Sequence, residues 1–306
     1  MRAPLRGMLC GALALAGCNQ PFLPDGGYDA RLVVYGILSS PADTQYVRIG
    51  RTSTTGATID VTDATVDIVP GNGDPTIRLR DTVVMHADPS GTIAPYHVYA
   101  AANFTPKSRV AYRLNVLPAA GGSAGGTALG LGPADVTLVN PGALSGPADS
   151  LVILASFGMA SGAFVVHLYV DYRVVAGGNV TVGSAEVPVA STVDATGKAV
   201  PLYPAFARVP VVVGTATASV TYDRAFYQQT IARIINANPP GAVTLTGARY
   251  TLTQIDDALY DYFYVRNGPK DTSTLRLDVP DFTNVAGGLG VIGCMQILSR
   301  TASIGP

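Results

Sequence analysis

Three glycines near residue 290 have the spacing of a dinucleotide-binding fingerprint. Gly288, Gly290 and Gly293 form the pattern G-x-G-x-x-G within "GGLGVIGCMQ". In that fingerprint the glycines begin a helix after a strand, and an acidic residue about 20 positions later binds the ribose. No Asp or Glu follows Gly293, and the residues after it have the pattern of a strand. We therefore expect no nucleotide, and we interpret the glycines as positions of close backbone approach in a strand.

One serine and three histidines are the other residues that could support hydrolysis or metal binding. Ser123 lies in "GGSAG" (121–125), which has the pattern of a nucleophile elbow, but an elbow needs a strand before it and a helix after it. His86, His97 and His167 lack the spacing of metal ligands. The sequence therefore predicts a protein without catalytic residues, metal or cofactor. The alternative is an exported hydrolase with a site that is not legible in the sequence.

Three aspartates lie where a short helix is expected to begin. Asp256, Asp257 and Asp261 could bind calcium, but acidic residues at a helix start usually cap the helix and offset its dipole. The segment 256–268 places Leu259, Tyr262 and Phe263 in one apolar stripe, which predicts a helix.

Four aromatic residues crowd this predicted helix. They are Tyr260, Tyr262, Phe263 and Tyr264. Continuous aromatic residues on a short helix cannot all face one core, so two interpretations stay open. The residues pack in the core, or they form an exposed surface for a partner or a glycan.

The N-terminal residues predict export and lipidation. Arg2 and Arg6 form a basic segment before a short apolar run, as in a secretory signal, and the run ends in "LAGC", the lipobox pattern of bacterial lipoproteins. We expect residues 1–17 to be removed and Cys18 to carry the lipid that binds the membrane. Asn19 favours the outer membrane, with the periplasmic face favoured over the cell surface. The alternative is an ordinary secretory signal that carries a cysteine.

Composition argues against nucleic acid as a partner and against disulfides. The 306-residue chain has 20 Lys and Arg against 21 Asp and Glu, and only 13% of its residues are charged. It has no basic patch for nucleic acid. Of its three cysteines, Cys10 leaves with the signal and Cys18 becomes a thioether. Cys294 then lacks an internal partner, and its apolar strand pattern predicts a small buried side chain.

The 34 glycines and 22 prolines, with abundant Tyr, Thr and Val, predict many short strands joined by turns. Strand-like runs include "ATVDIV" (64–69), "RVAYRLNVL" (109–117), "TLRLDVP" (274–280) and "LGVIGCMQILSR" (289–300). We expect a mainly β protein with two sandwiches, immunoglobulin- or transthyretin-like, the second with two short helices. The expected parts are residues 1–17 (signal peptide), 18–30 (tether), 31–118 (first sandwich), 119–135 (glycine-rich connection) and 136–306 (second sandwich).

Two segments of the second sandwich need separate interpretation. Residues 223–236 predict the other helix, with an apolar stripe of Phe226, Tyr227, Ile231, Ile234 and Ile235. The uncharged run from Leu151 to Val170 has the length of a membrane span, but glycines at its centre favour a hairpin. A transmembrane β-barrel is the remaining alternative.

Several motifs occur in the order found in one family of lipoproteins. After the lipobox come "LVVYGILSSPADTQYVRIGRT" (32–52), "DATVDIV" (63–69), "YRLNV" (112–116), "IDDALYDYFYV" (255–265) and "NVAGGLGVIG" (284–293). In these motifs the chain resembles the lipoproteins catalogued as domain of unknown function 4249, and it departs from them at "FGMASGAFVVHLYVDY". The resemblance implies a β-sandwich and association with TonB-dependent outer-membrane receptors, and it implies no catalytic residues. We therefore expect a non-enzymatic binding or accessory protein for such a receptor.

Overall fold

The computed structural model describes residues 29–53, 58–87, 93–146, 149–158, 161–210, 216–266 and 282–303. Most of these residues form strands, and the helices are short, so the predicted mainly β class is confirmed. Cys18 and the predicted signal peptide lie outside the described residues, as does the strand expected at "TLRLDVP" (274–280).

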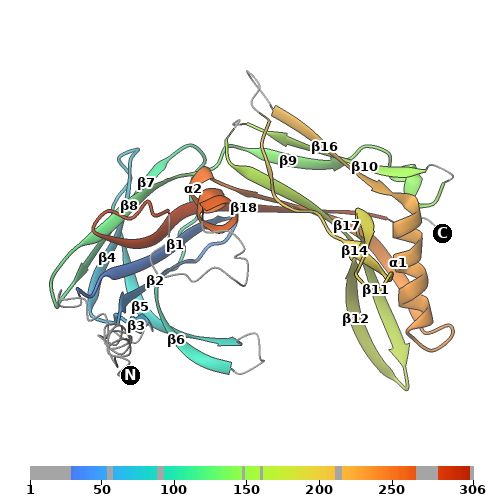
Figure 1. The fold of residues 1–306 in the computed structure, drawn as a ribbon, viewed down its shortest axis with the longest axis horizontal. Coiled ribbons are helices and arrows are strands. Elements are labelled where there is room, and N and C mark those ends of the chain that lie inside the picture. The colour runs from blue at the N-terminus through green and yellow to red at the C-terminus, as the bar shows by residue number, and fades with distance from the viewer. Residues whose placement is uncertain are drawn as a thin grey trace, which may run out of the picture. The chain divides into compact units, whose positions relative to one another are not determined.

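Most strands belong to one large mixed sheet (Figure 1). Its order is β12-β11-β17-β18-β1-β2-β6-β5-β4-β7-β8, with β3 also paired to β2 and β15 also paired to β11. The first half of the chain supplies β1 (Leu32–Ser40), β2 (Gln45–Thr52), β3 (Thr58–Asp60), β4 (Ala64–Pro70), β5 (Ile77–Ala87), β6 (Ile93–Ala101), β7 (Ala111–Pro118) and β8 (Ala124–Leu129). The second half supplies β11 (Ala163–Ala176), β12 (Asn179–Glu186), β15 (Ala207–Arg208), β17 (Val243–Ile255) and β18 (Gly288–Ala302).

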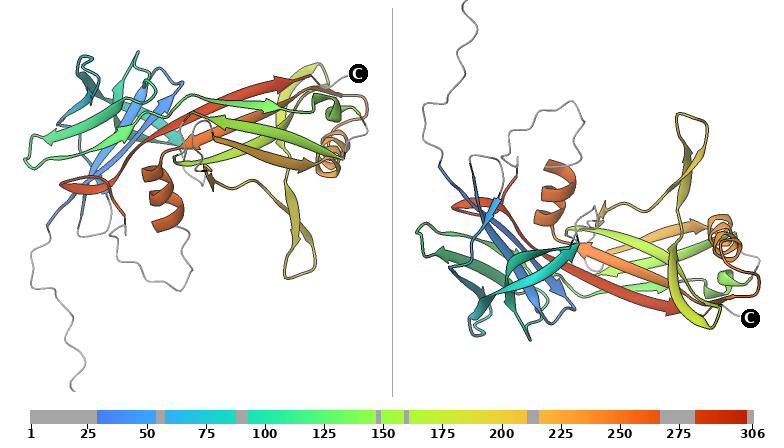
Figure 2. Two further views of the ribbon diagram at one scale, coloured as in Figure 1. Left: turned by 90° about the horizontal axis from the view of Figure 1, so that it is seen from above. Right: turned by 90° about the horizontal axis from the view of Figure 1, so that it is seen from below.

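A smaller sheet packs against one face of β11 and β17 (Figure 2). It contains β9 (Ala134–Leu138), β10 (Ser150–Phe157) and β16 (Ala216–Asp223). The ring centroids of Phe157 on β10 and Phe164 on β11 are 5.0 Å apart. The hydroxyl of Tyr222 on β16 donates to the carbonyl oxygen of Val166 on β11 at 2.7 Å. Apolar side chains from both layers therefore form one core between two sheets.

Four further elements belong to this half of the chain. They are the 3-10 helix η1 (Pro141–Leu144), the hairpin of β13 (Ala190–Val193) and β14 (Ala199–Leu202), and helix α1 (Arg224–Asn236). Helix α1 begins where the sequence predicts, because the side chain of Asp223 accepts a hydrogen bond from the amide of Ala225 at 2.7 Å. Its buried face is narrower than predicted: Ile234 is buried, whereas Ile235 is exposed.

The first half of the chain has a core of its own. Strand β7 alternates buried and exposed positions, with Tyr112, Leu114 and Val116 facing inward. Buried residues of this core run from Leu32 to Leu131 and resume at Val285, Ile292 and Cys294, whereas those of the second core run from Val136 to Leu252. The two cores therefore divide near the predicted connection at 119–135. Within that connection, however, residues 124–129 are not a linker, because they form β8 and pair with β7.

Strand β18 joins the two halves. It pairs in parallel with β1, from Leu32 with Gly288 to Ser40 with Gln296. It also pairs antiparallel with β17, from Ile255 with Met295 onward. The strand therefore contributes to the first core through Ile292 and Cys294 and extends into the sheet of the second half. Arg31–Pro306 accordingly form one compact unit.

The run from Leu151 to Val170 contains two strands but is not the hairpin that the sequence predicts. Strand β10 pairs with β9 and β16, whereas β11 pairs with β12, β15 and β17. The two strands meet through side chains of facing sheets, so their backbones do not pair. The described residues contain no helix with the length and hydropathy needed to cross a bilayer.

The glycines of the apparent nucleotide fingerprint lie in β18. Gly290 has a φ of +109°, and a Cβ there would overlap the carbonyl oxygen of Val34 on β1. A Cβ at Gly293 would overlap the side chain of Leu259. The interpretation as close backbone approach is therefore confirmed.

Candidate functional site

The predicted aromatic helix consists of one α turn and one wider turn. Helix α2 (Asp257–Tyr260) continues directly into the π-helix η2 (Asp261–Arg266) (Figure 1). Single π turns recur at functional sites. The extra residue per turn rotates later side chains away from an α-helical stripe. Phe263, predicted to share the buried stripe with Leu259, is therefore 44% exposed.

Asp256 fixes this helix to β18. Its Oδ1 accepts from the amide of Leu259 at 2.9 Å, and its Oδ2 accepts from the amide of Cys294 at 2.7 Å. Burial raises the pKa of Asp256 to about 6, against the lowering effect of these two hydrogen bonds. Burial and the nearby Asp256 also raise the pKa of Cys294, which is buried as predicted. Cys294 is therefore a protonated thiol, a poor nucleophile.

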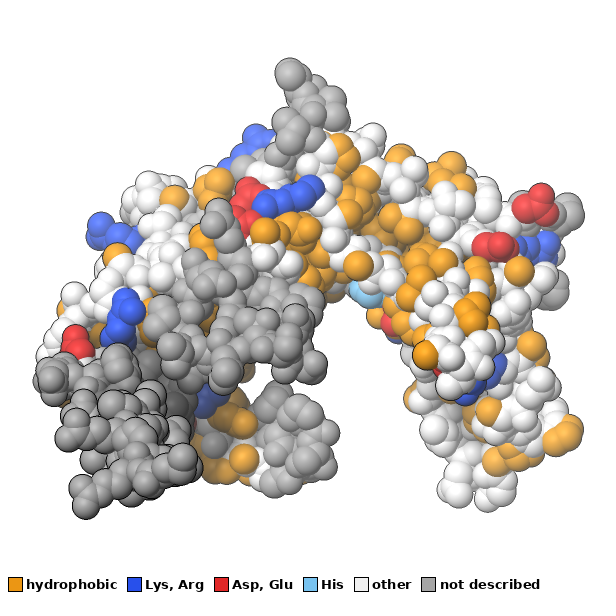
Figure 3. Space-filling view, viewed as in Figure 1, with side chains coloured by type: hydrophobic (Ala, Val, Ile, Leu, Met, Phe, Trp, Pro, Cys, Tyr) orange, Lys and Arg blue, Asp and Glu red, His pale blue; other side chains and the backbone are white. Residues whose placement is uncertain are grey.

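Arg208 holds the outer side of the helix. Its guanidinium forms ion pairs with Asp257 and with Asp261, the latter at 2.6 Å, and it lies 4.4 Å from the ring centroid of Tyr260. Acidic and basic side chains therefore gather beside hydrophobic ones over α2 (Figure 3). The carboxylates suggested as calcium ligands are used by an arginine and by the helix cap. No group of three or more His, Cys, Asp or Glu side chains suited to a metal occurs in the described part of the chain.

The four predicted aromatic residues divide between core and surface. Tyr262 is buried, and its hydroxyl donates to the hydroxyl of Tyr35 on β1 at 2.9 Å. Tyr260 stacks on Tyr264, with ring centroids 5.8 Å apart. Tyr264 is 48% exposed, and Phe263 is 44% exposed. Tyr262 therefore packs in the core, whereas Phe263 and Tyr264 are partly exposed.

The two exposed rings form one wall of a pocket of about 310 Å³. Phe206 belongs to the same wall, since its ring centroid lies 4.9 Å from that of Tyr264. We call this the aromatic pocket and define it by Val165, His167, Phe206, Thr253, Phe263 and Tyr264, with aliphatic side chains filling the rest of its lining. The polar side-chain groups of this set are the imidazole of His167 and the hydroxyls of Thr253 and Tyr264.

His167 has a fixed orientation at the pocket. Its Nδ1 lies 2.6 Å from Oε1 of Glu186 on the neighbouring strand β12. Further along the same sheet face, Arg249 makes a two-point ion pair with Asp171 at 2.9 and 3.2 Å and covers the ring of Tyr169. The charges of Arg249 and Asp171 are paired with each other, and the imidazole of His167 lines the pocket.

The remaining sequence candidates are not brought together with this site. His97 lies 3.3 Å from Asp81 on the β5–β6 hairpin, and the side chain of His86 lies outside the described residues. Ser123 precedes strand β8, so the strand–turn–helix of a nucleophile elbow is absent at that position.

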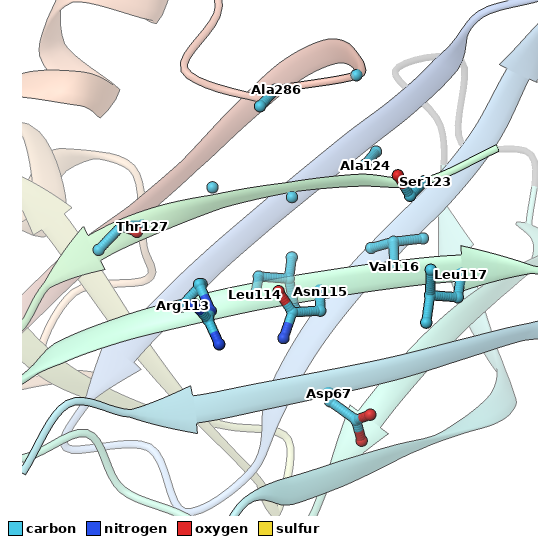
Figure 4. Close-up of a pocket in the computed structure, with 13 residues that line it drawn as sticks. Asp67, Arg113, Leu114, Asn115, Val116, Leu117, Ser123, Ala124, Thr127 and Ala286 are labelled. Atoms are coloured by element: carbon cyan, nitrogen blue, oxygen red, sulfur yellow. The ribbon is translucent and has the colours of Figure 1, made fainter.

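A second hollow of about 680 Å³ lies over β7 and β8 (Figure 4). Arg113 and Asn115 extend from β7 to the same side, and Asp67 of β4 is already paired with Arg78. The lining also includes three glycines, Gly125, Gly126 and Gly287, which contribute no side chains. This hollow is larger than the aromatic pocket, but it has few convergent side chains, so we take the aromatic pocket as the candidate site.

Sequence reasoning found two of the aromatic residues of the pocket and missed the rest of its lining. Tyr264 and Phe263 were predicted as candidate binding residues, whereas Phe206, Arg208 and the pairing of His167 with Glu186 were not. His167 and Glu186 lie in β11 and β12, Arg208 lies in β15, and Phe206 directly precedes β15; the pairing of these strands is not legible in the sequence. Alternation in β11 does indicate that His167 and Tyr169 share a face.

The fold and the site define a mainly β protein with an open, largely apolar pocket. No family model matches the chain, and no curated protein matches it. Among solved structures, the C-terminal globular domain of an oligosaccharyltransferase from Pyrococcus abyssi is similar at 12% identity, with a TM-score of 0.26. The alignment covers 76% of this chain and 50% of that one, so the chain spans about half of that domain's length. A likeness this weak carries no functional argument.

Proposed function

We propose that this protein is a lipid-anchored outer-membrane lipoprotein, held on the periplasmic face by Cys18, that binds a partner and has no catalytic activity. The observation that carries the proposal is the sequence "LAGC", residues 15–18, after a basic and then apolar segment. The resemblance in motif order to lipoproteins associated with TonB-dependent receptors supports such a receptor as the partner.

The aromatic pocket supports a binding role. Its exposed rings lie on a helix held by Arg208 and Asp256, so the surface is rigid before a partner arrives. Exposed aromatic side chains next to a pocket are typical of interaction surfaces.

The lipid anchor is tested by replacing Cys18. Cys18→Ala should lose all labelling by a palmitate analogue and should leave an unprocessed or aberrantly processed chain. The thiol is the acceptor of the lipid, and the acyl chains supply about 0.8 kcal/mol of membrane affinity per buried CH₂. Cys10→Ala, eight residues earlier in the same segment, is the matched control and should be labelled like the unmodified chain. Equal labelling of the two variants would mean that Cys18 is not the lipid site.

The partner is tested by co-purification from outer membranes in mild detergent. A TonB-dependent receptor should accompany the chain, and Phe263→Ala should reduce its recovery. Val182→Ala, which removes an exposed side chain of β12 outside the pocket, should not. Failure to recover any receptor would count against the accessory role, whatever the outcome of lipid labelling.

A second candidate function, an exported hydrolase, is favoured by one observation. Glu186 orients His167 at 2.6 Å beside a pocket, which is how a carboxylate orients a general-base histidine. No described Ser, Thr or Cys side chain hydrogen-bonds to His167, so the nucleophile would be water. A panel of ester and glycoside substrates tests this candidate. Turnover that His167→Gln abolishes would support it, and the absence of turnover above the blank would exclude it for those substrates.

A further inference from the structure

The size and walls of the aromatic pocket suit one ring system. Its volume of about 310 Å³ is at the lower end of the roughly 300–1,000 Å³ that ligand pockets occupy. Phe206, Phe263 and Tyr264 present ring surfaces, and Val165 presents an aliphatic one. A sugar would leave several of its hydroxyls without partners here, because the defining side chains carry polar groups only on His167, Thr253 and Tyr264.

The polar side of the pocket offers a hydrogen-bond acceptor. An ionised carboxylate can only accept, so Nδ1 of His167 carries the hydrogen that faces Glu186. In the neutral ring, Nε2 is then the acceptor. No described residue donates to Nε2 of His167. An occupant that carries an N–H or O–H on its ring complements this arrangement, and a ring without a donor does not.

The rim of the pocket indicates a polypeptide occupant. Phe263, Tyr264 and Val265 are each roughly half exposed, so they continue the apolar surface outside the pocket. A site built for a small molecule encloses most of its ligand, whereas an open pocket with an apolar rim is typical of a protein interface with one anchor side chain.

We propose that the aromatic pocket receives one donor-bearing aromatic side chain, a tryptophan or a tyrosine, from the partner protein. This inference rests on the proposed binding function and names what the partner must present. His167 accepts the hydrogen bond from the ring, and Glu186 is a positioning residue that fixes which nitrogen accepts. Phe263, Tyr264 and Phe206 contact the ring faces.

The chain itself provides a clean assay, because it contains no tryptophan. The full-length lipidated protein in lipid nanodiscs is titrated against the tripeptide Ac-Gly-Trp-Gly-amide, followed by indole fluorescence, with empty nanodiscs as the blank. The same tripeptide with 1-methyltryptophan keeps the ring and loses the donor. We expect saturable binding of the first peptide and about three- to tenfold weaker binding of the second.

Variants separate the contribution of the hydrogen bond to His167 from that of the ring contacts with the pocket walls. Phe263→Ala should weaken the binding of both peptides, and Val182→Ala should weaken the binding of neither. Glu186→Gln should reduce the ratio of the affinities for the two peptides, because the position of the hydrogen on the imidazole is then no longer fixed. Thermal unfolding of each variant checks that the fold is intact, and the exposed position of Phe263 keeps that test informative if Glu186→Gln fails to fold.

Three results would overturn the inference. Equal affinities of the two peptides would show that no donor is recognised. Binding of free indole as tight as the tryptophan peptide would assign the pocket to a small aromatic molecule. No saturable binding of any ring probe, with receptor still co-purifying, would reject this use of the pocket and leave the proposed accessory function intact.

Discussion

The two halves of β18 are held in different ways. From Met295 to Ala302 the strand pairs with β17 in an ordinary antiparallel ladder. From Gly288 to Cys294 it has β1 on one side, and on the other side single side chains take the place of a neighbouring strand. Asn284 donates to the carbonyl oxygen of Ile292 at 2.6 Å and accepts from its amide at 2.9 Å.

Two more side chains complete this substitute for a strand. Thr283 donates to the carbonyl oxygen of Gly290 at 2.8 Å, and Asp256 accepts from the amide of Cys294. A free strand edge is thereby satisfied without a partner chain. The comparison teaches that the first half of β18 depends on particular residues, whereas the second half depends on a backbone pattern that many sequences can form.

The largest effect is expected from Gly290→Ala. A Cβ at this position meets the carbonyl oxygen of Val34 while φ is +109°, so we expect a loss of about 4 kcal/mol or more in unfolding free energy. Gly73→Ala is the control, since Gly73 has a φ of +85° but nothing within 4 Å of the added Cβ. It should lose only about 1 kcal/mol. Urea denaturation measures both, and equal losses would refute close approach as the role of Gly290.

The next effect is a pH dependence from Asp256. Burial raises the folded-state pKa to about 6 from 3.8, so the unfolded chain ionises first as pH rises. The contribution of Asp256 to the unfolding free energy is therefore complete below about pH 4 and is lost as the pH rises through about 6. The total loss is on the order of 3 kcal/mol.

This pH dependence is measured as urea unfolding at several pH values for the unmodified chain and for Asp256→Asn. The amide does not titrate, so the variant should lack this part of the slope. Parallel pH profiles for the two proteins would contradict the role of Asp256.

Removing the side-chain amide of Asn284, which takes the place of a neighbouring strand, should have a smaller effect on the unfolding free energy. Asn284→Ala leaves the amide and carbonyl of buried Ile292 without partners, with an expected loss of about 2 kcal/mol. Asn140 makes the same two-bond contact with Ser150 and Val152, which are only partly buried. Asn140→Ala should therefore lose less, because water can replace the side chain there. A larger loss at Asn140 than at Asn284 in chemical denaturation would reverse this reasoning.

The smallest effect is expected in the second half of β18. Thr251→Val removes the hydrogen bond between the hydroxyls of Thr251 and Ser299 at 3.0 Å, on an exposed face of the β17–β18 pair. The ladder itself stays, and valine suits a strand, so the change in unfolding free energy should stay within about 0.5 kcal/mol. A loss above that of Asn284→Ala would mean that the two halves are not built differently.

Local patterns in the sequence predicted much of the fold. Alternation and turn residues predicted β4, β7 and β18, and Asp223 and Asp256 marked the starts of both helices. Each of these signals is read within a few residues, so it does not depend on distant partners. The mainly β class follows from them.

The pairing of distant segments was not predictable in the same way. Nothing in the run from Leu151 to Val170 shows that its two strands join different sheets, because alternation fixes which face is buried but not which strand lies beside it. The same limit applies to the pocket. Phe263 and Tyr264 were visible as an aromatic excess, but Phe206 and His167 reach them only through the pairing of β11 with β15 and β17.

The pairing of β1 with β18 delays completion of the fold. These are the first and last strands of the described residues, and Leu32 meets Gly288 across almost the whole unit. Contacts so distant along the chain form slowly, because the loop must close before they contribute any stability. As synthesis proceeds from the N-terminus, Val34 has no neighbour on that side until residue 290 is available. A chain that cannot finish folding until this last described strand is available therefore keeps one edge of β1 unpaired for most of its synthesis.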